Sequence, residues 1–387
     1  MVLLVVSGAD VNKVDQDGYT PLIRAINNDN LNLVTFLVGK GAKINVVKQK
    51  THLLFLASFL KNLDIFEFLI KQPEVVKIEN EFGAQPLAWF AKKGDLDVLK
   101  LLIENGADVN HQDKNDYTAL HMAIMDQHEK TALFLLKNGA NPNLVDVKEQ
   151  FPIHLSTLLG NFDITKKLLQ YGSKPDESDI EGMTPLMNVI ISGNVRLIKA
   201  YIKYLIKKNK TKAFIKISIY KKRSILQWLL RKHPRAVIKK NEHPYDLDSF
   251  DEIFKYILNY CGEHLDFFHR DSYGCTIAHW LAKVGAYKSF HFFYKENYKN
   301  INYINRLLTE KSEGKDKMSA LEFVDQVLSE KYLKIDEEFK NDLKLTKDVI
   351  NDWLDFYSRS KELDKIQKRQ MPLNSDFHYH PKKRKKG

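Results

Sequence analysis

The sequence feature that most constrains the fold is a short glycine-containing motif that returns at a nearly constant interval. Gly-Ala or Gly-Ser, followed by a polar residue, occurs at Gly8, Gly41, Gly106, Gly139 and Gly172. The intervals between them are 33, 65, 33 and 33 residues, and 65 is two intervals less one residue. A repeat of this length indicates a stack of small units rather than one globular core, because no unit can bury its apolar face alone.

The most regular unit begins at Asp113 and contains Thr-Ala-Leu-His from Thr118, then two apolar stretches, the second of which ends at Gly139. The threonine hydroxyl can cap the free N–H groups of a first helix, and glycine tolerates the left-handed conformation that ends a second helix. Other units place proline at the first helical position, where a missing N–H costs nothing, namely at Pro21, Pro86, Pro152 and Pro185. Each unit is therefore predicted to be a pair of helices, joined to the next pair by a turn.

These residues at this spacing resemble the ankyrin repeat. The resemblance covers residues 1–200 regularly and 224–330 with insertions, and it implies an all-α solenoid of stacked helix pairs with turn fingers. We divide the chain into regular repeats (1–200, the first truncated), degenerate repeats with a basic insertion (201–330), a helical cap (331–371) and a basic tail (372–387). Because the chain starts within a repeat, we interpret it as a fragment or an incomplete gene model.

Composition limits the protein class. Hydrophobic residues make up 44% and charged residues 28% of the chain, as in soluble folded proteins. No apolar run approaches the roughly 18 residues of a membrane span, and the short apolar start lacks the basic residues of a signal peptide. The two cysteines, Cys261 and Cys275, give no disulfide framework. We expect an intracellular protein of the cytoplasm or nucleus, neither secreted nor transmembrane.

Ankyrin-like proteins bind through their turn tips and the concave ends of their first helices, so the resemblance implies candidate partner-binding positions. Many of these positions carry apolar side chains, and contiguous exposed apolar surface usually marks an interaction site. Packing beneath loops or against a folded-back C-terminal segment is the alternative interpretation. The predicted partner-binding residues are Tyr19, Phe59, Leu60, Phe82, Tyr117, Met125, Leu158, Leu159, Met183 and Ile191.

Positive charge is concentrated in one stretch. Residues 201–240 contain 14 Lys/Arg and no acid, residues 1–200 contain 21 Lys/Arg and 24 Asp/Glu, and the remainder balances, so this stretch accounts for the net +11. Such a segment can attract RNA, an anionic membrane or an acidic protein, although a solvated insertion is the simpler interpretation because no nucleic-acid-binding motif is present. The candidate anion-binding residues are Lys207, Lys208, Lys210, Lys212, Lys221, Lys222 and Arg223, and the tail at Lys382–Lys386 resembles a nuclear import signal.

Catalytic and metal-binding motifs give little support for an enzyme. Cys261-x-x-His264 and Cys275-x-x-x-His279 have zinc-like spacing, but His279 belongs to a Thr-x-x-His repeat position where His121 and His154 have no neighbouring cysteine. No nucleophile elbow, phosphate-binding loop or His-Glu-x-x-His motif occurs. We predict a non-catalytic protein-binding scaffold or adaptor without metal, cofactor or small-molecule substrate. The alternatives are a regulatory fragment of a larger enzyme or channel, and an adaptor for anionic surfaces or nucleic acid through residues 201–240.

Overall fold

A computed structural model describes most of the repeat region and parts of the C-terminal region. The described residues are 5–44, 53–54, 57, 63–72, 75–210, 223–231, 247–261, 265–284, 286, 288–289, 293, 306, 308–309, 311–312, 318–329, 341–352, 354–355 and 358–359. The chain forms two compact units, one made of Met1–Lys232 with Glu242–Leu265 and the other of His233–Asn241 with Asp266–Gly387.

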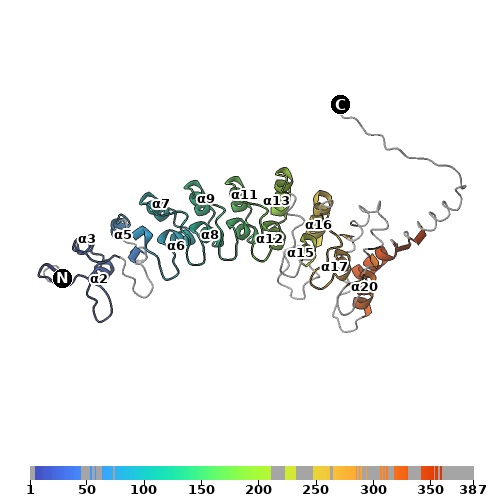
Figure 1. The fold of residues 1–387 in the computed structure, drawn as a ribbon, viewed down its shortest axis with the longest axis horizontal. Helices are drawn as coiled ribbons and strands as arrows, with labels where there is room; N and C mark the ends of the chain where they lie inside the picture. Colours follow the sequence, from blue (N-terminus) through green and yellow to red (C-terminus); the bar gives the residue numbers. More distant parts are fainter. Residues whose placement is uncertain are drawn as a thin grey trace, which may run out of the picture. The chain divides into compact units, whose positions relative to one another are not determined.

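The first unit is a stack of helix pairs (Figure 1). Its elements in chain order are α2 (Pro21–Asn27), α3 (Leu31–Gly39), α5 (Leu63–Ile70), the 3-10 helix η1 (Val75–Lys77), α6 (Pro86–Lys93), α7 (Leu96–Glu104), α8 (Ala119–Met125), α9 (Glu129–Lys137), α10 (Pro152–Leu158), α11 (Phe162–Gln170), α12 (Pro185–Ser192), α13 (Val195–Lys207), α15 (Ile225–Arg231) and α16 (Leu247–Cys261). First helices pack on first helices, from α6 through α8, α10 and α12 to α15. The second helices α7, α9 and α11 pack in a parallel row, and α13 packs on α16.

The N-terminal ends of the first helices confirm the predicted roles of threonine and proline. The hydroxyl groups of Thr20, Thr118 and Thr184 accept hydrogen bonds from backbone N–H groups of the first turns of α2, α8 and α12. Helices α2, α6, α10 and α12 begin at the predicted prolines. These contacts satisfy N–H groups that have no partner inside the helix, so the starting residue of each first helix follows from local sequence.

Buried histidines connect one repeat to the next. The ring of His121 accepts a hydrogen bond from the backbone N–H of Thr118 at 3.1 Å through Nδ1, and its Nε2 lies 3.4 Å from the carbonyl oxygen of Gln150. The ring of His154 likewise places Nε2 3.2 Å from the carbonyl oxygen of Met183. Burial lowers the pKa of both rings below the usual histidine value. Both side chains are therefore neutral structural links between a first helix and the following turn.

Asparagine side chains connect the repeats at the other end of the helix pairs. Asn12 donates to the carbonyl oxygen of Gly41 and accepts from the N–H of Lys43. Asn110 and Asn143 make the same pair of bonds to the following repeats, at 3.1 and 2.7 Å and at 3.0 and 3.0 Å. The next equivalent position holds Asp176, whose carboxylate lies 3.4 Å from the ammonium group of Lys210. A carboxylate cannot donate to a carbonyl oxygen, so the asparagine ladder is not continued there.

The degenerate repeats also form helices. Within the region predicted to hold degenerate repeats, α15 and α16 form a helix pair, and α13 runs for 13 residues against nine in α11. In the second unit, α17 (Ile277–Lys283) packs on α20 (Ala320–Ser329), and the Nε2 atom of His279 lies 2.9 Å from the carbonyl oxygen of Met318. Residues 341–352 are helical, and Lys347 pairs with Asp325 of α20 at 2.6 Å. The all-α repeat architecture is therefore confirmed, while the proposed boundaries at 200, 330 and 371 stay predictions.

Candidate protein-interaction surface

The turns between repeats are rigid fingers, each organised by one side chain at its start. In the finger 146–150, the Oδ1 atom of Asp146 accepts hydrogen bonds from the backbone N–H groups of Lys148 and Gln150 at 2.9 and 2.8 Å. The same pair of bonds occurs at Asn80, Asp113 and Asp179. An acidic or amide side chain at this position fixes the turn before any partner arrives.

Four consecutive fingers are joined to one another through their backbones. The N–H of Lys114 donates to the carbonyl oxygen of Phe82 at 2.9 Å, and the N–H of Val147 donates to that of Asn115 at 3.2 Å. The third link runs from the N–H of Ile180 to the carbonyl oxygen of Lys148 at 3.0 Å. We call the fingers 80–84, 113–117, 146–150 and 179–183 the finger row.

Large apolar side chains stand exposed on the finger row. Phe82 is 58% exposed, Val147 is 52% exposed and Ile180 is 56% exposed. These side chains contribute nothing to the core, and exposed apolar side chains grouped on one face often mark a binding surface. Val147 and Ile180 lie on neighbouring fingers, and the finger between Phe82 and Val147 carries the exposed Lys114. Phe82 was predicted, whereas Val147 and Ile180 were not. The signal for both was available, since each directly follows the aspartate that organises its finger.

Other predicted contact residues lie at helix ends or half-buried in the fingers. Leu158 and Leu159, at the C-terminal end of α10, are 44% and 41% exposed. Met125, at the end of α8, is half-buried. The ring of Tyr117 is half-buried too and lies edge-on to the His121 ring. Burial, and after it the negative charge of Asp146, raises the pKa of the Tyr117 hydroxyl, so that this group stays a neutral hydrogen-bonding group.

The interpretation of Met183 as an exposed contact residue is wrong. Its side chain is 8% exposed and forms a cluster with Met187 and Trp228, against which the half-buried Ile191 packs. Trp228 of α15 covers this part of α12 because the degenerate repeat continues the stack. Tyr19 is half-buried beneath the Arg24 guanidinium, which lies 4.4 Å from its ring, and Phe59 and Leu60 lie outside the described residues.

The basic candidates do not form one surface in the described structure. Lys207, Lys208 and Lys210 are exposed at the end of α13, and Lys210 pairs with Asp176. Arg223 is fully buried, with its guanidinium 5.3 Å from the Trp228 ring, so the interpretation of Arg223 as a solvent-facing anion ligand is wrong. Its burial follows from its place at the start of α15, inside the stack. The remaining candidates Lys212, Lys221 and Lys222, and the tail at 382–386, lie outside the described residues.

The zinc-like histidine serves the repeat structure instead. The Nδ1 atom of His279 lies 2.7 Å from the Thr276 hydroxyl, and Nε2 faces the carbonyl oxygen of Met318. Among the residues that the structure describes, no group of three metal-ligating side chains comes together. In the same part of the chain, no helix is both long and apolar enough to cross a bilayer.

Comparison with known proteins identifies the repeats. The family model described as "Ankyrin repeats (3 copies)" matches residues 1–78 and 53–146, and the model "Ankyrin repeats (many copies)" matches residues 153–206. The chain belongs to the ankyrin repeat family. Ankyrin repeats are a general protein–protein interaction module and are generally non-catalytic.

Individual relatives share only the repeat region of this ankyrin repeat protein. Ankyrin repeat protein nuc-2 of Neurospora crassa is 30% identical, over 33% of this chain and 15% of its own length. The human transient receptor potential cation channel subfamily A member 1 is 31% identical, over 31% of this chain and 11% of its own length. A probable 26S proteasome regulatory subunit p28 of Saccharomyces cerevisiae is 34% identical, over 31% of this chain and 55% of its own length. The chain thus spans a small part of the first two relatives and about half of the third.

Among solved structures, the ankyrin repeat domain of Bcl-3 matches with a TM-score of 0.47 and 18% sequence identity. The match covers 55% of this chain and 94% of the Bcl-3 domain.

Proposed function

We propose that this ankyrin repeat protein is a non-catalytic scaffold or adaptor that binds a partner protein through the finger row and the adjoining ends of the first helices. The observation that carries the proposal is the presence of three exposed apolar side chains, Phe82, Val147 and Ile180, on fingers that are hydrogen-bonded to one another. By resemblance to other ankyrin repeat proteins, we place the helix-end residues Met125, Leu158 and Leu159 at the border of the same face.

Preorganisation explains how such a surface gains affinity. The aspartate and asparagine side chains fix each finger, and the inter-finger bonds fix the spacing between neighbouring fingers. Binding therefore costs little free energy for ordering the fingers, and burial of their apolar tips contributes directly to affinity. Phe82 is the best candidate for a dominant contact because aromatic side chains bury a large area at a small entropic cost.

Partner capture from extracts of the native cell, quantified by mass spectrometry, tests the proposal. The variant Phe82→Glu/Val147→Glu/Ile180→Glu should retain less than about one tenth of each specific partner, because burying three carboxylates in an apolar interface is strongly unfavourable. Tyr117→Glu/Met125→Glu should weaken capture as well. Val14→Glu is a single-site control for the effect of placing a carboxylate at an exposed apolar position, since Val14 is 56% exposed but lies outside the finger row. Equal capture by the folded triple variant and the wild type would refute the proposal.

The two alternative functions have separate tests. Relatives such as the transient receptor potential channel contain a matching region within a much longer protein, which supports a role as the regulatory part of a channel or enzyme; the full reading frame decides this alternative. A role on anionic surfaces has weaker support because Arg223 is buried and Lys210 is paired. That role requires binding to RNA or anionic vesicles that falls steeply with salt.

A further inference from the structure

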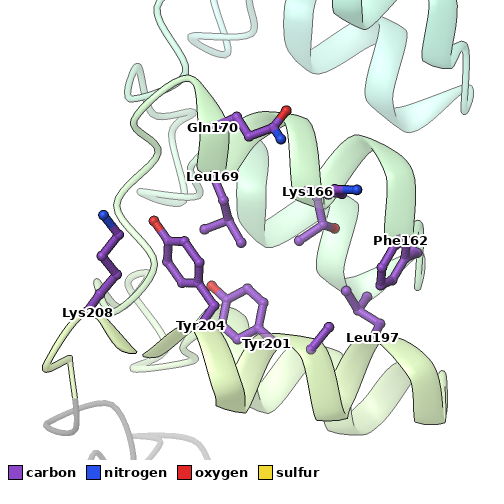
Figure 2. Close-up of a pocket in the computed structure, with 10 residues that line it drawn as sticks. Phe162, Lys166, Leu169, Gln170, Leu197, Tyr201, Tyr204 and Lys208 are labelled. Carbon is purple, nitrogen blue, oxygen red and sulfur yellow. The ribbon is translucent and has the colours of Figure 1, made fainter. Parts of the chain in front are cut away.

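The second helices of two successive repeats leave a cavity between them. It lies between α11 and α13 and has a volume of about 480 Å³. Helices α9 and α11 pack more closely than α11 and α13 do. Figure 2 shows the side chains of both helices facing one another across this groove, with Phe162 and Leu197 at one end and Tyr204 and Lys208 at the other.

Two sequence features distinguish the step between α11 and α13, where the cavity lies. The asparagine ladder that joins earlier repeats has Asp176 at this step, and Asp176 pairs with Lys210 beyond the end of α13. Helix α13 is also longer than α11, and its additional turn carries Tyr204 along the groove. The buried Tyr201 hydroxyl donates to the carbonyl oxygen of Pro175 at 2.9 Å, which holds this ring in the floor of the groove. The Tyr201 ring is therefore a fixed part of the lining.

The lining is apolar in its middle and cationic at its rim. Leu197 and Tyr201 are buried, while Phe162, Leu169 and Tyr204 are half-buried and offer apolar surface to an occupant. Two exposed lysines, Lys166 and Lys208, line the groove together with Gln170 and Ala200. No carboxylate lines it in the described structure.

The charged side chains on the two helices around the groove are also mainly basic. Helix α13 carries Arg196, Lys199, Lys203 and Lys207 and no acidic residue. The Arg196 guanidinium stacks over the Phe162 ring at 3.9 Å, and Lys199 pairs with Glu252 of α16. On α11 the one acidic residue, Asp163, accompanies Lys166 and Lys167. Basic side chains therefore outnumber acidic ones on these two helices, which favours a negatively charged occupant and disfavours a basic one.

We propose that the groove between α11 and α13 binds an acidic amphipathic segment of a partner protein. One leucine-sized or aromatic side chain of the segment would occupy the cavity between Leu169 and Tyr204, and flanking carboxylates would face Lys166 and Lys208. This binding surface consists of second helices and is separate from the finger row. An apolar centre with a rim of charge opposite to that of the ligand is the arrangement that gives both affinity and selectivity in peptide-binding grooves.

A defined probe tests the proposal on the full chain. The probe is a fluorescein-labelled 12-residue peptide with leucine and phenylalanine on one helical face and glutamate elsewhere, and binding is followed by fluorescence anisotropy. We expect saturable binding that weakens as salt increases. A peptide with lysine in place of glutamate should bind at least tenfold more weakly, and so should polyglutamate, which lacks the apolar side chains.

Two variants locate the binding. Lys166→Glu/Lys208→Glu reverses the rim charge, and Ala200→Trp fills the groove from an exposed position on α13. Each should weaken probe binding at least tenfold. The matched control Lys130→Glu/Lys137→Glu makes the same change of charge on exposed positions of α9 and should bind within about twofold of the wild type. Circular dichroism and urea unfolding establish that each variant is folded.

The outcomes separate this proposal from the finger-row function. The variant Phe82→Glu/Val147→Glu/Ile180→Glu should bind the probe as the wild type does. Absence of saturable probe binding, equal binding of the lysine peptide, or unchanged binding by folded Ala200→Trp would overturn the proposal. Stronger binding of RNA or of phosphatidylserine vesicles than of the probe, lost in Lys166→Glu/Lys208→Glu, would assign the groove to another class of ligand and would also overturn it.

Discussion

Replacement of Asp146 by alanine tests the link between finger rigidity and binding. Asp146 is 2% exposed, and its Oδ1 atom accepts the two N–H groups of Lys148 and Gln150 at 2.9 and 2.8 Å. The backbone bonds between Asp146 and residues 149 and 150 do not involve the side chain. Asp146→Ala therefore removes two charge-assisted hydrogen bonds while leaving the chain path of the turn available.

The expected loss follows from these two bonds. A hydrogen bond to a charged group contributes about 1.5–3 kcal/mol to stability. The pair would therefore contribute roughly 3–6 kcal/mol, less the cost of keeping a carboxylate buried in the folded protein. We expect Asp146→Ala to lower the free energy of unfolding by about 2–3 kcal/mol. Asp146→Asn keeps the acceptor oxygen but not its charge, so it should lose about half as much.

Three measurements test how the loss of these hydrogen bonds affects stability, the order of the finger and partner binding. Urea unfolding gives the loss of stability, amide hydrogen exchange reports the N–H groups of residues 148 and 150, and partner capture reports the surface that carries Val147. The alanine variant should be the least stable, exchange fastest at these two amides and bind most weakly. If its unfolding free energy stays within about 0.5 kcal/mol of the wild type and exchange is unchanged, the side chain does not organise the finger.

Two further predictions concern the links between repeats and the turns inside them. Burial lowers the pKa of His121 and His154, so below about pH 6.5 the unfolded chain takes up protons before the folded chain does. The stability present above that pH should therefore fall as the pH drops toward the pKa values of the folded protein. Urea midpoints between pH 7.5 and 5.5 measure this, and midpoints that stay constant or rise toward acid pH would contradict it. Gly94→Ala should destabilise the protein more than Gly106→Ala. Both glycines have a positive φ, but a Cβ at Gly94 would lie 2.7 Å from the Nδ1 atom of His128, while one at Gly106 meets open space. Thermal unfolding should show a loss of stability of about 1–2 kcal/mol from backbone strain for Gly106→Ala and a larger loss for Gly94→Ala, and equal losses would argue against the contact with His128.

Local sequence was sufficient to predict the helix pairs. The caps at Thr118 and Thr184 depend on residues only three positions apart, so their helix starts could be read without knowledge of the rest of the fold. Degenerate repeats were also predicted over residues 224–330, and α15 and α16 are helices in that range. The resemblance to the ankyrin repeat, and not local spacing, pointed to Phe82, Leu158 and Leu159, which are exposed.

Burial that depends on a later repeat could not be predicted in this way. Met183 occupies a finger position like Tyr117, but Trp228 of α15 covers the cluster that contains it. Arg223 belongs to a cationic run in the sequence, yet its place at the start of α15 buries it. Both errors arise because a periodic pattern tells which face a residue occupies in its own repeat, and the identity of the covering residue comes from the next one.

The two proposed surfaces can differ in function because the stack opens at one side only. Between the repeat of α10 and α11 and the repeat of α12 and α13, the fingers stay joined, with the N–H of Ile180 bonded to the carbonyl oxygen of Lys148 at 3.0 Å, and His154 still contacts Met183. At the second helices of the same two repeats, Asp176 stands where the earlier steps have Asn110 and Asn143, and the cavity lies between α11 and α13. Repeats contact only their neighbours, so such a local change need not disturb the finger row. Asp176→Asn should therefore restore the amide donor, draw the two second helices together and weaken binding of the acidic probe while partner capture by the fingers is unchanged. Simultaneous loss of both activities in a folded Asp176→Asn protein would show that the two faces act as one.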